Sequence, residues 1–534
     1  MGRGERAKAP VWRLALVFMF LSIVFISIFA RIFYLMYYES DFLQSQGNAR
    51  SLRDVKVPAY RGMLLDRHNS VLAVSTPVMS VWASPHDVQL DDPKLKDLAT
   101  FLNLSFQELR QKLASNKTKH FLYLLRSIPP ADAKKIQQLG LAGIHLQKEY
   151  KRFYPLANVF APVLGFTNID EKGIEGLELA YEPFLKGEYG VRRVIKDRLG
   201  RVIDEVSLLR SPRIGQNINL SLDKRIQYEA YRNLKDTVKE FQAKSGSVVV
   251  MDVNTGEILA MANYPSFNPN APITSRDGRY RNRAVTDIFE PGSVMKAFSV
   301  ASALDSGLFS PDTLIDTSPS WLKIDGNIVH DERANGILSV MQIMKRSSNV
   351  GIAKMVLASP AYQLESLLRR VGFGQLTGSG FPGESMGMLE DKTLASPFVI
   401  ATLGFGYGLS ATTLQLAQAY AVFANQGYLL PARFSVADPT AKLGKHVLSK
   451  KVAKEVLEML EAVVEKDGTG RHARVQRYRV AGKTGTSRIA TKHGYDKNKH
   501  IASFVGIAPV SAPKLVIAVV IREPTRVSYY GGRV

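Results

Sequence analysis

Cysteine is absent from this chain of 534 residues. Its absence excludes disulfide frameworks, zinc–thiolate sites, iron–sulfur clusters and cysteine nucleophiles, so any covalent catalysis must use another side chain. Long basic blocks are absent as well, although 70 Lys and Arg outnumber 48 Asp and Glu and give a formal charge of +22. Because the basic residues are scattered, the charge does not indicate a nucleic-acid-binding face, and we expect no nucleic-acid partner.

The chain has only one long apolar run, within residues 14–38. A helix of this length can cross about 30 Å of hydrocarbon, and no other stretch can, which excludes a polytopic membrane protein. A cleaved signal peptide is the alternative, but no small-x-small cleavage site follows Ala30, so we predict an uncleaved, single-pass transmembrane helix. The basic residues of the tail at 1–13 predict that this tail is cytoplasmic and that the chain after about residue 39 is exported.

The rest of the sequence has the composition of a folded protein, with 46% hydrophobic and 22% charged residues. Residues 39–215 mix short strand patterns with a helical stretch at about Pro93 to Leu141, and predict a membrane-proximal α+β module. Residues 216–534 begin and end with strand patterns and have helices between them. This order predicts an α/β domain whose antiparallel sheet gathers both ends of the segment.

A serine and a lysine in this second segment could carry chemistry. Ser293 follows Pro291 and Gly292 and opens a stretch that is apolar on nearly every side, as in a buried helix. Lys296 comes one helical turn later, where a lysine of lowered pKa could take the proton of the serine hydroxyl. The spacing alone is weak evidence. It recurs at Ser221/Lys224, Ser320/Lys323 and Ser511/Lys514.

Two further motifs follow in order along the chain. Ser347 and Asn349 form a Ser-x-Asn pattern, and Lys483-Thr484-Gly485-Thr486 lies within an apolar strand. Gly485 lets a ligand approach the strand backbone, so a peptide could add to this edge with Lys483 near its terminal carboxylate. The three motifs in this order are the signature of penicillin-binding proteins and class A β-lactamases.

The chain resembles the class B penicillin-binding proteins from about Arg61 to Gly532. The resemblance is carried by the stretches around the three motifs and, nearer the N-terminus, by RGMLLDRHNSVLA and KGIEGLELAYEPFLKG. More narrowly, the chain is similar to the division-specific septal peptidoglycan D,D-transpeptidases of Gram-negative bacteria. The resemblance implies the penicillin-binding transpeptidase fold for residues 216–534, with a central antiparallel sheet flanked by helices. It implies an elongated, non-catalytic pedestal for residues 39–215.

The same resemblance implies catalytic roles for four motif residues. Ser293 would attack the carbonyl of the penultimate D-Ala of a stem pentapeptide and release the terminal D-Ala. Lys296 would act as general base, Ser347 would relay a proton to the leaving amine, and Asn349 would hold the substrate amide. An amine of a neighbouring stem would then take the acyl group and form the cross-link.

Substrate binding, inhibitors and partners are also implied by the resemblance. The terminal carboxylate would bind at Lys483, Thr484, Gly485 and Thr486, and β-lactams would leave Ser293 acylated. No metal or other cofactor is expected. The expected partners are stem pentapeptides, a membrane-embedded polymerase of glycan strands and other division proteins. The expected location is the bacterial inner membrane, with the catalytic domain in the periplasm.

Several alternatives and departures bear on this interpretation. A β-lactamase would need a water-activating carboxylate; Glu365 partly fits the pattern for one, but Arg369 replaces the usual Asn. A β-lactam sensor would need several membrane spans, a bifunctional polymerase would need a further domain, and a scaffold would not need Ser293. The elongation-specific relative performs the same reaction. Ala157, Pro162 and Thr413 depart from the family pattern. Relatives continue into a helix after Gly532, so either the domain is truncated at Val534, as we expect, or its sheet lacks a covering helix.

Overall fold

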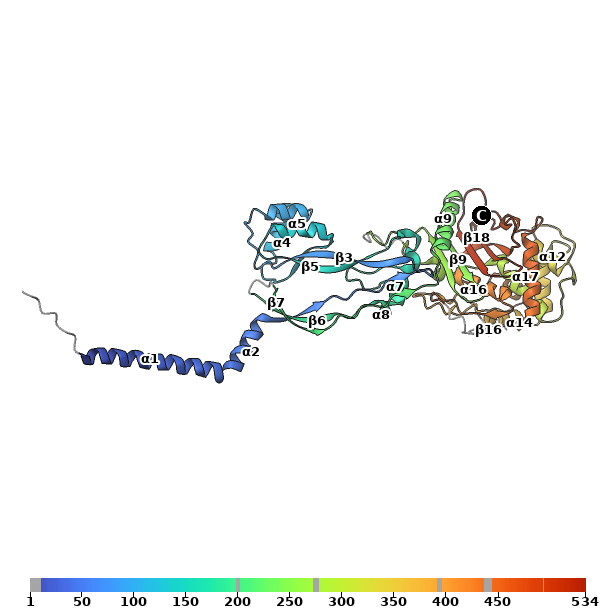
Figure 1. The fold of residues 1–534 in the computed structure, drawn as a ribbon. Coiled ribbons are helices and arrows are strands. Elements are labelled where there is room, and N and C mark those ends of the chain that lie inside the picture. The colour runs from blue at the N-terminus through green and yellow to red at the C-terminus, as the bar shows by residue number, and fades with distance from the viewer. Residues whose placement is uncertain (1–10, 198–201, 272–277, 391–395, 437–443, 493) are drawn as a thin grey trace, which may run out of the picture. The chain divides into compact units, whose positions relative to one another are not determined.

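The computed structural model describes the chain except at residues 1–10, 198–201, 272–277, 391–395, 437–443 and 493 (Figure 1). It begins with helix α1 (Val11–Tyr37), which is followed by α2 (Ser40–Ser51). α1 has 27 residues, none of them buried, and a length of about 40 Å at 1.5 Å a residue. Within the described residues it is the one helix long and apolar enough to cross a membrane, in agreement with the predicted span.

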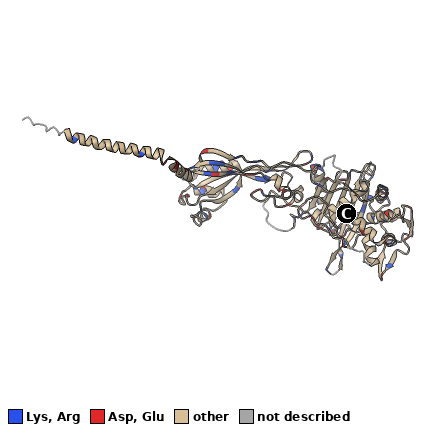
Figure 2. Cartoon of the chain, turned by 90° about the horizontal axis from the view of Figure 1, so that it is seen from below, with Lys and Arg blue, Asp and Glu red and all other residues tan. Residues whose placement is uncertain are grey.

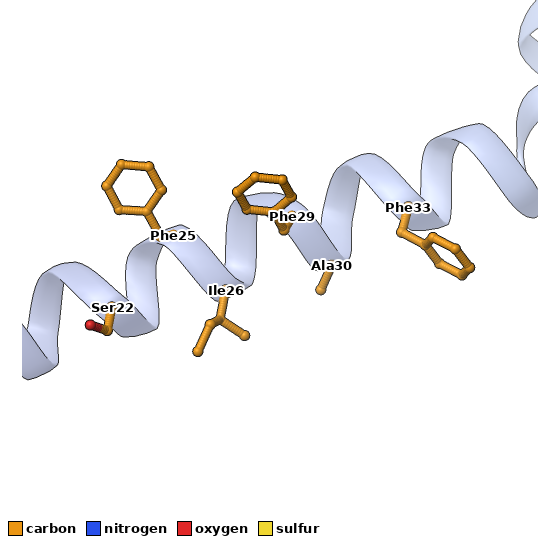
Figure 3. Close-up of a pocket in the computed structure, with 6 residues that line it drawn as sticks. All are labelled: Ser22, Phe25, Ile26, Phe29, Ala30 and Phe33. Atoms are coloured by element: carbon orange, nitrogen blue, oxygen red, sulfur yellow. The ribbon is translucent and has the colours of Figure 1, made fainter.

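α1 contains few charged residues (Figure 2). A shallow hollow on it is shown in Figure 3, where the side chains of Phe25 and Phe29 point away from those of Ile26 and Ala30. Residues of this single helix alone line the hollow, namely Ser22, Phe25, Ile26, Phe29, Ala30 and Phe33. The hollow is therefore part of an apolar helix surface, suited to lipid, and not an enclosed binding cavity.

The chain divides into two compact units, the first of which comprises residues 1–59, 80–147 and 188–213. It contains an antiparallel sheet of β1 (Leu52–Val57), β6 (Gly190–Lys196) and β7 (Val202–Arg210), in that order. Between these strands in the chain lie α3 (Leu95–Phe101), α4 (Phe106–Ala114), β4 (Leu122–Ile128) and α5 (Pro130–Gln138). Two strands, β3 (Val71–Ala83) and β5 (Ile144–Phe153), contribute residues to both units.

The helical stretch expected at about Pro93 to Leu141 is only partly helical, because β4 interrupts it. Its residues form a short apolar run, and periodicity does not distinguish a short strand from a turn of buried helix. Pairing with β3 makes the run a strand.

The second unit comprises residues 60–79, 148–187 and 214–534. Its main sheet has the order β10-β9-β19-β18-β17 and is antiparallel throughout. The strands are β9 (Ser245–Asp252), β10 (Ile258–Tyr264), β17 (Ala481–Thr491), β18 (Gly494–Ala508) and β19 (Leu515–Arg522). The first two come from the start of the segment and the last three from its end, so the predicted antiparallel sheet that gathers both ends is confirmed.

Helices cover both faces of this sheet. On β9, Gly246 faces α9 (Lys224–Glu240), where an added Cβ would lie 2.7 Å from Leu234. The next residue, Ser247, forms a hydroxyl–hydroxyl hydrogen bond of 2.8 Å with Thr413 of α16 (Thr413–Ala424). Because successive strand residues face opposite sides, α9 and α16 lie on opposite faces of the sheet. Every residue of α16 is buried, as in a helix that packs against neighbours on all sides.

Further helices of this unit surround the sequence motifs. They are the short 3₁₀ helix η2 (Gly292–Met295), α11 (Lys296–Asp305), α12 (Val340–Arg346), α13 (Asn349–Ala358), α14 (Ala361–Arg370), α15 (Pro397–Gly404) and α17 (Lys450–Val464). All but the last residue of α11 are buried, so it is a core helix as predicted. A hairpin of β12 (Trp321–Ile324) and β13 (Asn327–His330) precedes α12.

A buried charge cluster connects two stretches of the second unit, residues 60–79 and 148–187. Glu178 accepts hydrogen bonds from Arg61 and Arg152, each at 2.7 Å, and Arg61 also contacts Glu182 at 2.6 Å. Arg61, Arg152 and Glu178 are each at least 95% buried, so each charge needs its partners. Both stretches belong to the same compact unit as residues 214–534. The boundary predicted between residues 215 and 216 stays a prediction.

Candidate active site

Ser293 lies in η2, immediately before the core helix α11, and is half-buried. The turn depends on Gly292, whose φ of +63° is a conformation that favours glycine. Gly292 donates a backbone hydrogen bond of 3.1 Å to the carbonyl oxygen of Gly406. An added Cβ at Gly406 would lie 2.1 Å from the Gly292 oxygen, so both glycines are needed to seat this turn.

The strand that carries the Lys-Thr-Gly-Thr motif, β17, packs directly against this turn. A Cβ at Gly485 would lie 2.9 Å from the Pro291 oxygen and 3.0 Å from Val294. A Cβ at Gly292 would in turn lie 3.0 Å from the Thr486 oxygen. Glycine at position 485 therefore lets the third motif approach the first. Two segments far apart in the sequence are brought side by side in this way.

Lys296 is fully buried at the start of α11. Its Nζ donates hydrogen bonds to the Ser347 backbone oxygen at 2.5 Å and to Ser347 Oγ at 3.1 Å. Burial lowers the pKa of Lys296 to about 7, although the charges of Asp331 and Glu332 act in the opposite direction. Near neutral pH a large fraction of this amine is therefore unprotonated and able to accept a proton.

Lys483 is the second fully buried lysine of the site. Its Nζ donates hydrogen bonds to Ser347 Oγ at 3.0 Å and to the Thr484 backbone oxygen at 3.1 Å. Burial, together with the charge of Lys296, holds the pKa of Lys483 well below its usual range. The Ser347 hydroxyl of the second motif thus contacts Lys296 of the first motif and Lys483 of the third. Ser293 of the first motif is not part of these contacts.

Ser347 has a strained backbone. It follows α12 with φ 59° and ψ 42°, in the left-handed region that non-glycine residues rarely occupy. Such outliers are frequent at active sites, where the surroundings hold them in place. The left-handed turn separates α12 from α13 and leaves the Ser347 hydroxyl between the two lysines.

Asn349 and its neighbours are held by a residue that the sequence analysis missed. Asp331, directly after β13, accepts hydrogen bonds from Ser348 Oγ at 2.6 Å and from the backbone N–H groups of Asn349 and Val350 at 2.5 and 2.9 Å. The Asn349 side-chain amide donates to the His330 oxygen at 2.8 Å. Asp331 thus caps α13 and fixes the second motif. No sequence motif includes Asp331, because it lies outside the local pattern around Ser347.

The threonines of the third motif alternate with Lys483 and Gly485 along β17. Thr484 Oγ1 donates to Thr469 Oγ1 at 3.3 Å, and Thr486 Oγ1 accepts from the Gly531 N–H at 3.1 Å. Thr469 and Gly531 are therefore neighbours of the predicted carboxylate site. Among the described residues none is hydrogen-bonded to Ser293 Oγ; catalytic hydrogen bonds are often long in a ligand-free enzyme and shorten when substrate binds.

Ser221, of another Ser-x-x-Lys repeat, and Glu365, of the β-lactamase pattern, have contacts of their own. Ser221 is fully buried and donates to the oxygens of Ile258 and Arg433, which is a structural role. Glu365 lies in α14 and forms an ion pair of 2.9 Å with Arg369. No cluster of three potential metal-ligating side chains occurs among the residues described here.

A serine before a core helix, two buried lysines and a serine hydroxyl between them, beside an antiparallel sheet, are typical of serine acyltransferases of the penicillin-recognising type. The chain belongs to the penicillin-binding protein family of peptidoglycan D,D-transpeptidases. The penicillin-binding protein transpeptidase domain family matches residues 246–534, and the penicillin-binding protein dimerisation domain family matches residues 56–220. The family predicted from the motifs, the fold and the class of enzyme are thereby confirmed.

Relatives of known sequence and structure support this membership. The probable peptidoglycan D,D-transpeptidase PbpC of Pseudomonas aeruginosa is 40% identical, with 98% of this chain and 92% of that protein covered. Peptidoglycan D,D-transpeptidase FtsI of Escherichia coli is 39% identical, with coverage of 99% and 90%. Penicillin-binding protein 3 of Mycobacterium tuberculosis, complexed with aztreonam, has a TM-score of 0.69 at 27% identity, with coverage of 88% and 92%.

Replacing Asp331 with asparagine should lower the pKa of Lys296 below about 7, because a negative charge that raises this pKa is lost. Asparagine keeps one oxygen to accept from the backbone N–H groups of Asn349 and Val350. The acid limb of the pH profile for acylation by a fluorescent penicillin should therefore move to lower pH. Glu332→Gln should move it less, since Asp331 has the larger effect. A profile that Asp331→Asn leaves in place would contradict this assignment.

Proposed function

We propose that this chain cross-links septal peptidoglycan through an acyl-enzyme on Ser293. The Ser293 oxygen attacks the carbonyl carbon of the penultimate D-Ala, and the unprotonated Nζ of Lys296 accepts the hydroxyl proton. The tetrahedral intermediate collapses, the peptide bond breaks, and the terminal D-Ala leaves as its amine takes this proton from Lys296 through the Ser347 hydroxyl. The amine of a second stem peptide then attacks the ester, loses its proton and restores the Ser293 hydroxyl.

The observation that carries this proposal is the Ser347 hydroxyl between two buried lysines, at 3.1 Å from Lys296 and 3.0 Å from Lys483. A hydroxyl that accepts from two amines is well suited to pass a proton to a leaving amine. The pKa of about 7 of Lys296 supports its role as base, because this value is close to a neutral working pH.

Substrate binding is assigned to Asn349 and to the third motif. Asn349 would hold a substrate amide, and Lys483, Thr484 and Thr486 would bind the terminal carboxylate while Gly485 leaves room for the strand-like peptide. A bound carboxylate raises the pKa of Lys483 again and thus favours its charged form. The backbone N–H groups of Ser293 and Thr486 would form the oxyanion hole, which the close packing of the two segments supports.

The proposal is tested by locating the covalent adduct that a β-lactam leaves. Trypsin should release a peptide of residues 284–296, because Arg283 and Lys296 bound it. Mass spectrometry after penicillin treatment should find the added mass on this peptide and, by fragmentation, on Ser293. An adduct on another peptide would overturn the proposed nucleophile.

We also assign the orientation and the partners of the chain. The basic tail at 1–13 supports a cytoplasmic N-terminus, with the catalytic unit in the periplasm of a bacterial inner membrane. A membrane-embedded glycan-strand polymerase and other division proteins are the expected partners. Because the chain lacks cysteine, Ser511→Cys provides a single reporter on an exposed residue. A membrane-impermeant maleimide should label this cysteine in spheroplasts without lysis.

The role in division is tested by depleting the protein. Filamentous cells would support a septal role, and round cells would indicate a role in elongation.

A further inference from the structure

A lysine of α12 forms two ion pairs that the proposed mechanism does not use. Lys345 Nζ lies 2.8 Å from Glu465 Oε2 and 2.7 Å from Asp467 Oδ1, and only 18% of its side chain is exposed. Hydrogen bonds to Asp467 and Glu465 raise the pKa of Lys345, so it is charged at neutral pH. Lys345 stands two residues before Ser347 in the chain.

Its partners belong to a tight loop, residues 465–470, that follows α17. The N–H of Gly468 donates to the Glu465 oxygen at 3.0 Å, and that of Gly470 donates to the Val463 oxygen at 2.9 Å. A Cβ at Gly468 would lie 2.0 Å from the Val463 oxygen, so the loop has no room to shift toward α17. The loop is thus a compact turn with a fixed position on the end of this helix.

The same loop also reaches the third motif. Thr469 lies between the two glycines and accepts the hydrogen bond of 3.3 Å from Thr484 Oγ1. Thr484 is the neighbour of Lys483, whose Nζ contacts Ser347 Oγ. Residues 465–470 therefore contact α12, which leads into the second motif, through Lys345, and contact the third motif through Thr469. The Ser347 hydroxyl lies where these two motifs meet.

We propose that Lys345, Glu465 and Asp467 are positioning residues, which set the separation between Ser347 and the Lys483–Thr484 strand. This inference rests on the proposed function. The Ser347 hydroxyl can serve both lysines only while each contact stays near 3 Å, and hydrogen bonds weaken steeply as they lengthen or bend. The ion pairs act at the last turn of α12, where a small rotation would carry Ser347 away from the strand.

The energetics favour positioning over a contribution to folding. The side chains of Glu465 and Asp467 are 58% and 65% exposed. Ion pairs with exposed partners contribute little to stability because water and salt screen them. Misplacement of a reacting group by about 1 Å can nevertheless slow a reaction strongly. Loss of these ion pairs should therefore slow acylation much more than it destabilises the fold.

The experiment measures the rate of acylation by a fluorescent penicillin and the thermal midpoint of the full chain in detergent. Lys345→Met keeps the length of the side chain but removes its charge, and should slow acylation roughly tenfold with little change in the midpoint. Lys345→Arg can still bridge both carboxylates and should restore most of the rate. Lys451→Met, at an exposed lysine of α17, is the matched control and should change neither quantity.

A second set of variants tests the loop from its other side. Glu465→Gln combined with Asp467→Asn should slow acylation as Lys345→Met does, and adding Lys345→Met should slow it no further, because one interaction is lost in each case. An unchanged rate in Lys345→Met, or a rate that Lys345→Arg fails to restore, would overturn the positioning role. Labelling of Ser293→Ala is measured in parallel, so failure of the nucleophile assignment is recognised separately.

Discussion

Replacement of Ser293 by alanine should abolish covalent labelling by penicillin and lower the acylation rate by roughly 10⁴-fold or more. Alanine lacks the oxygen that forms the ester, and no other side chain of the site can replace it at the same position. The fold should remain, because Ser293 is half-buried and its turn is held by backbone contacts of Gly292. Quantitative gel fluorescence of the labelled chain measures this loss.

A decoy serine provides the control for this variant. Ser511 also precedes a lysine, Lys514, by three residues but is exposed at the end of a strand hairpin. Ser511→Ala should label like the unaltered chain. If Ser293→Ala retained labelling while Ser511→Ala lost it, Ser511 and not Ser293 would be the nucleophile. If both retained labelling, neither serine would be the nucleophile.

The parts of the fold that the sequence predicts well are those with a strong local signal. The apolar run at 14–38 lies almost entirely within the helix Val11–Tyr37. The β-branched runs at both ends of residues 216–534 form neighbouring strands. Pro291 and Gly292 correctly predict a structural break before Ser293, although the residue lies in a 3₁₀ turn and α11 begins only at Lys296. The order of the motifs then predicts the family, because three short motifs in a fixed order occur by chance less often than any one of them.

The remaining features depend on contacts between distant segments. The β4 run is a strand only because β3 is beside it, which periodicity cannot reveal. Asp331 caps a helix that begins 18 residues later in the chain, and the partners of Lys345 lie more than 100 residues away. An aspartate or a lysine without a local pattern is ordinarily a solvated surface residue. Only the folded chain shows which of them face the site.

Replacement of Lys296 by methionine should have opposite effects on activity and stability. Methionine keeps the buried, unbranched shape but cannot accept the Ser293 proton, so acylation should fall by about 10³-fold, within the usual range for a lost general base. The fold should gain stability at neutral pH and below, because a fully buried amine whose charged form is penalised has been removed. If Lys296 had only a structural role, its replacement would instead lower activity and stability together.

The pH dependence of stability separates the contribution of this amine from others. The pKa of Lys296 is about 7 in the folded chain and near its ordinary value of 10.5 in the unfolded chain, so the unfolded state binds more protons between these values. The free energy of unfolding of the unaltered chain therefore rises as pH increases from about 7 to 10.5, by on the order of 4 kcal/mol from this group. Lys483 adds a rise of the same sign, which Lys296→Met retains in reduced form because the charge that depresses its pKa is gone. The increase in thermal midpoint from pH 6.5 to pH 9 should thus be smaller in Lys296→Met than in the unaltered chain. An equal increase in both would show that Lys296 is not the buried, deprotonated base on which acylation of Ser293 depends.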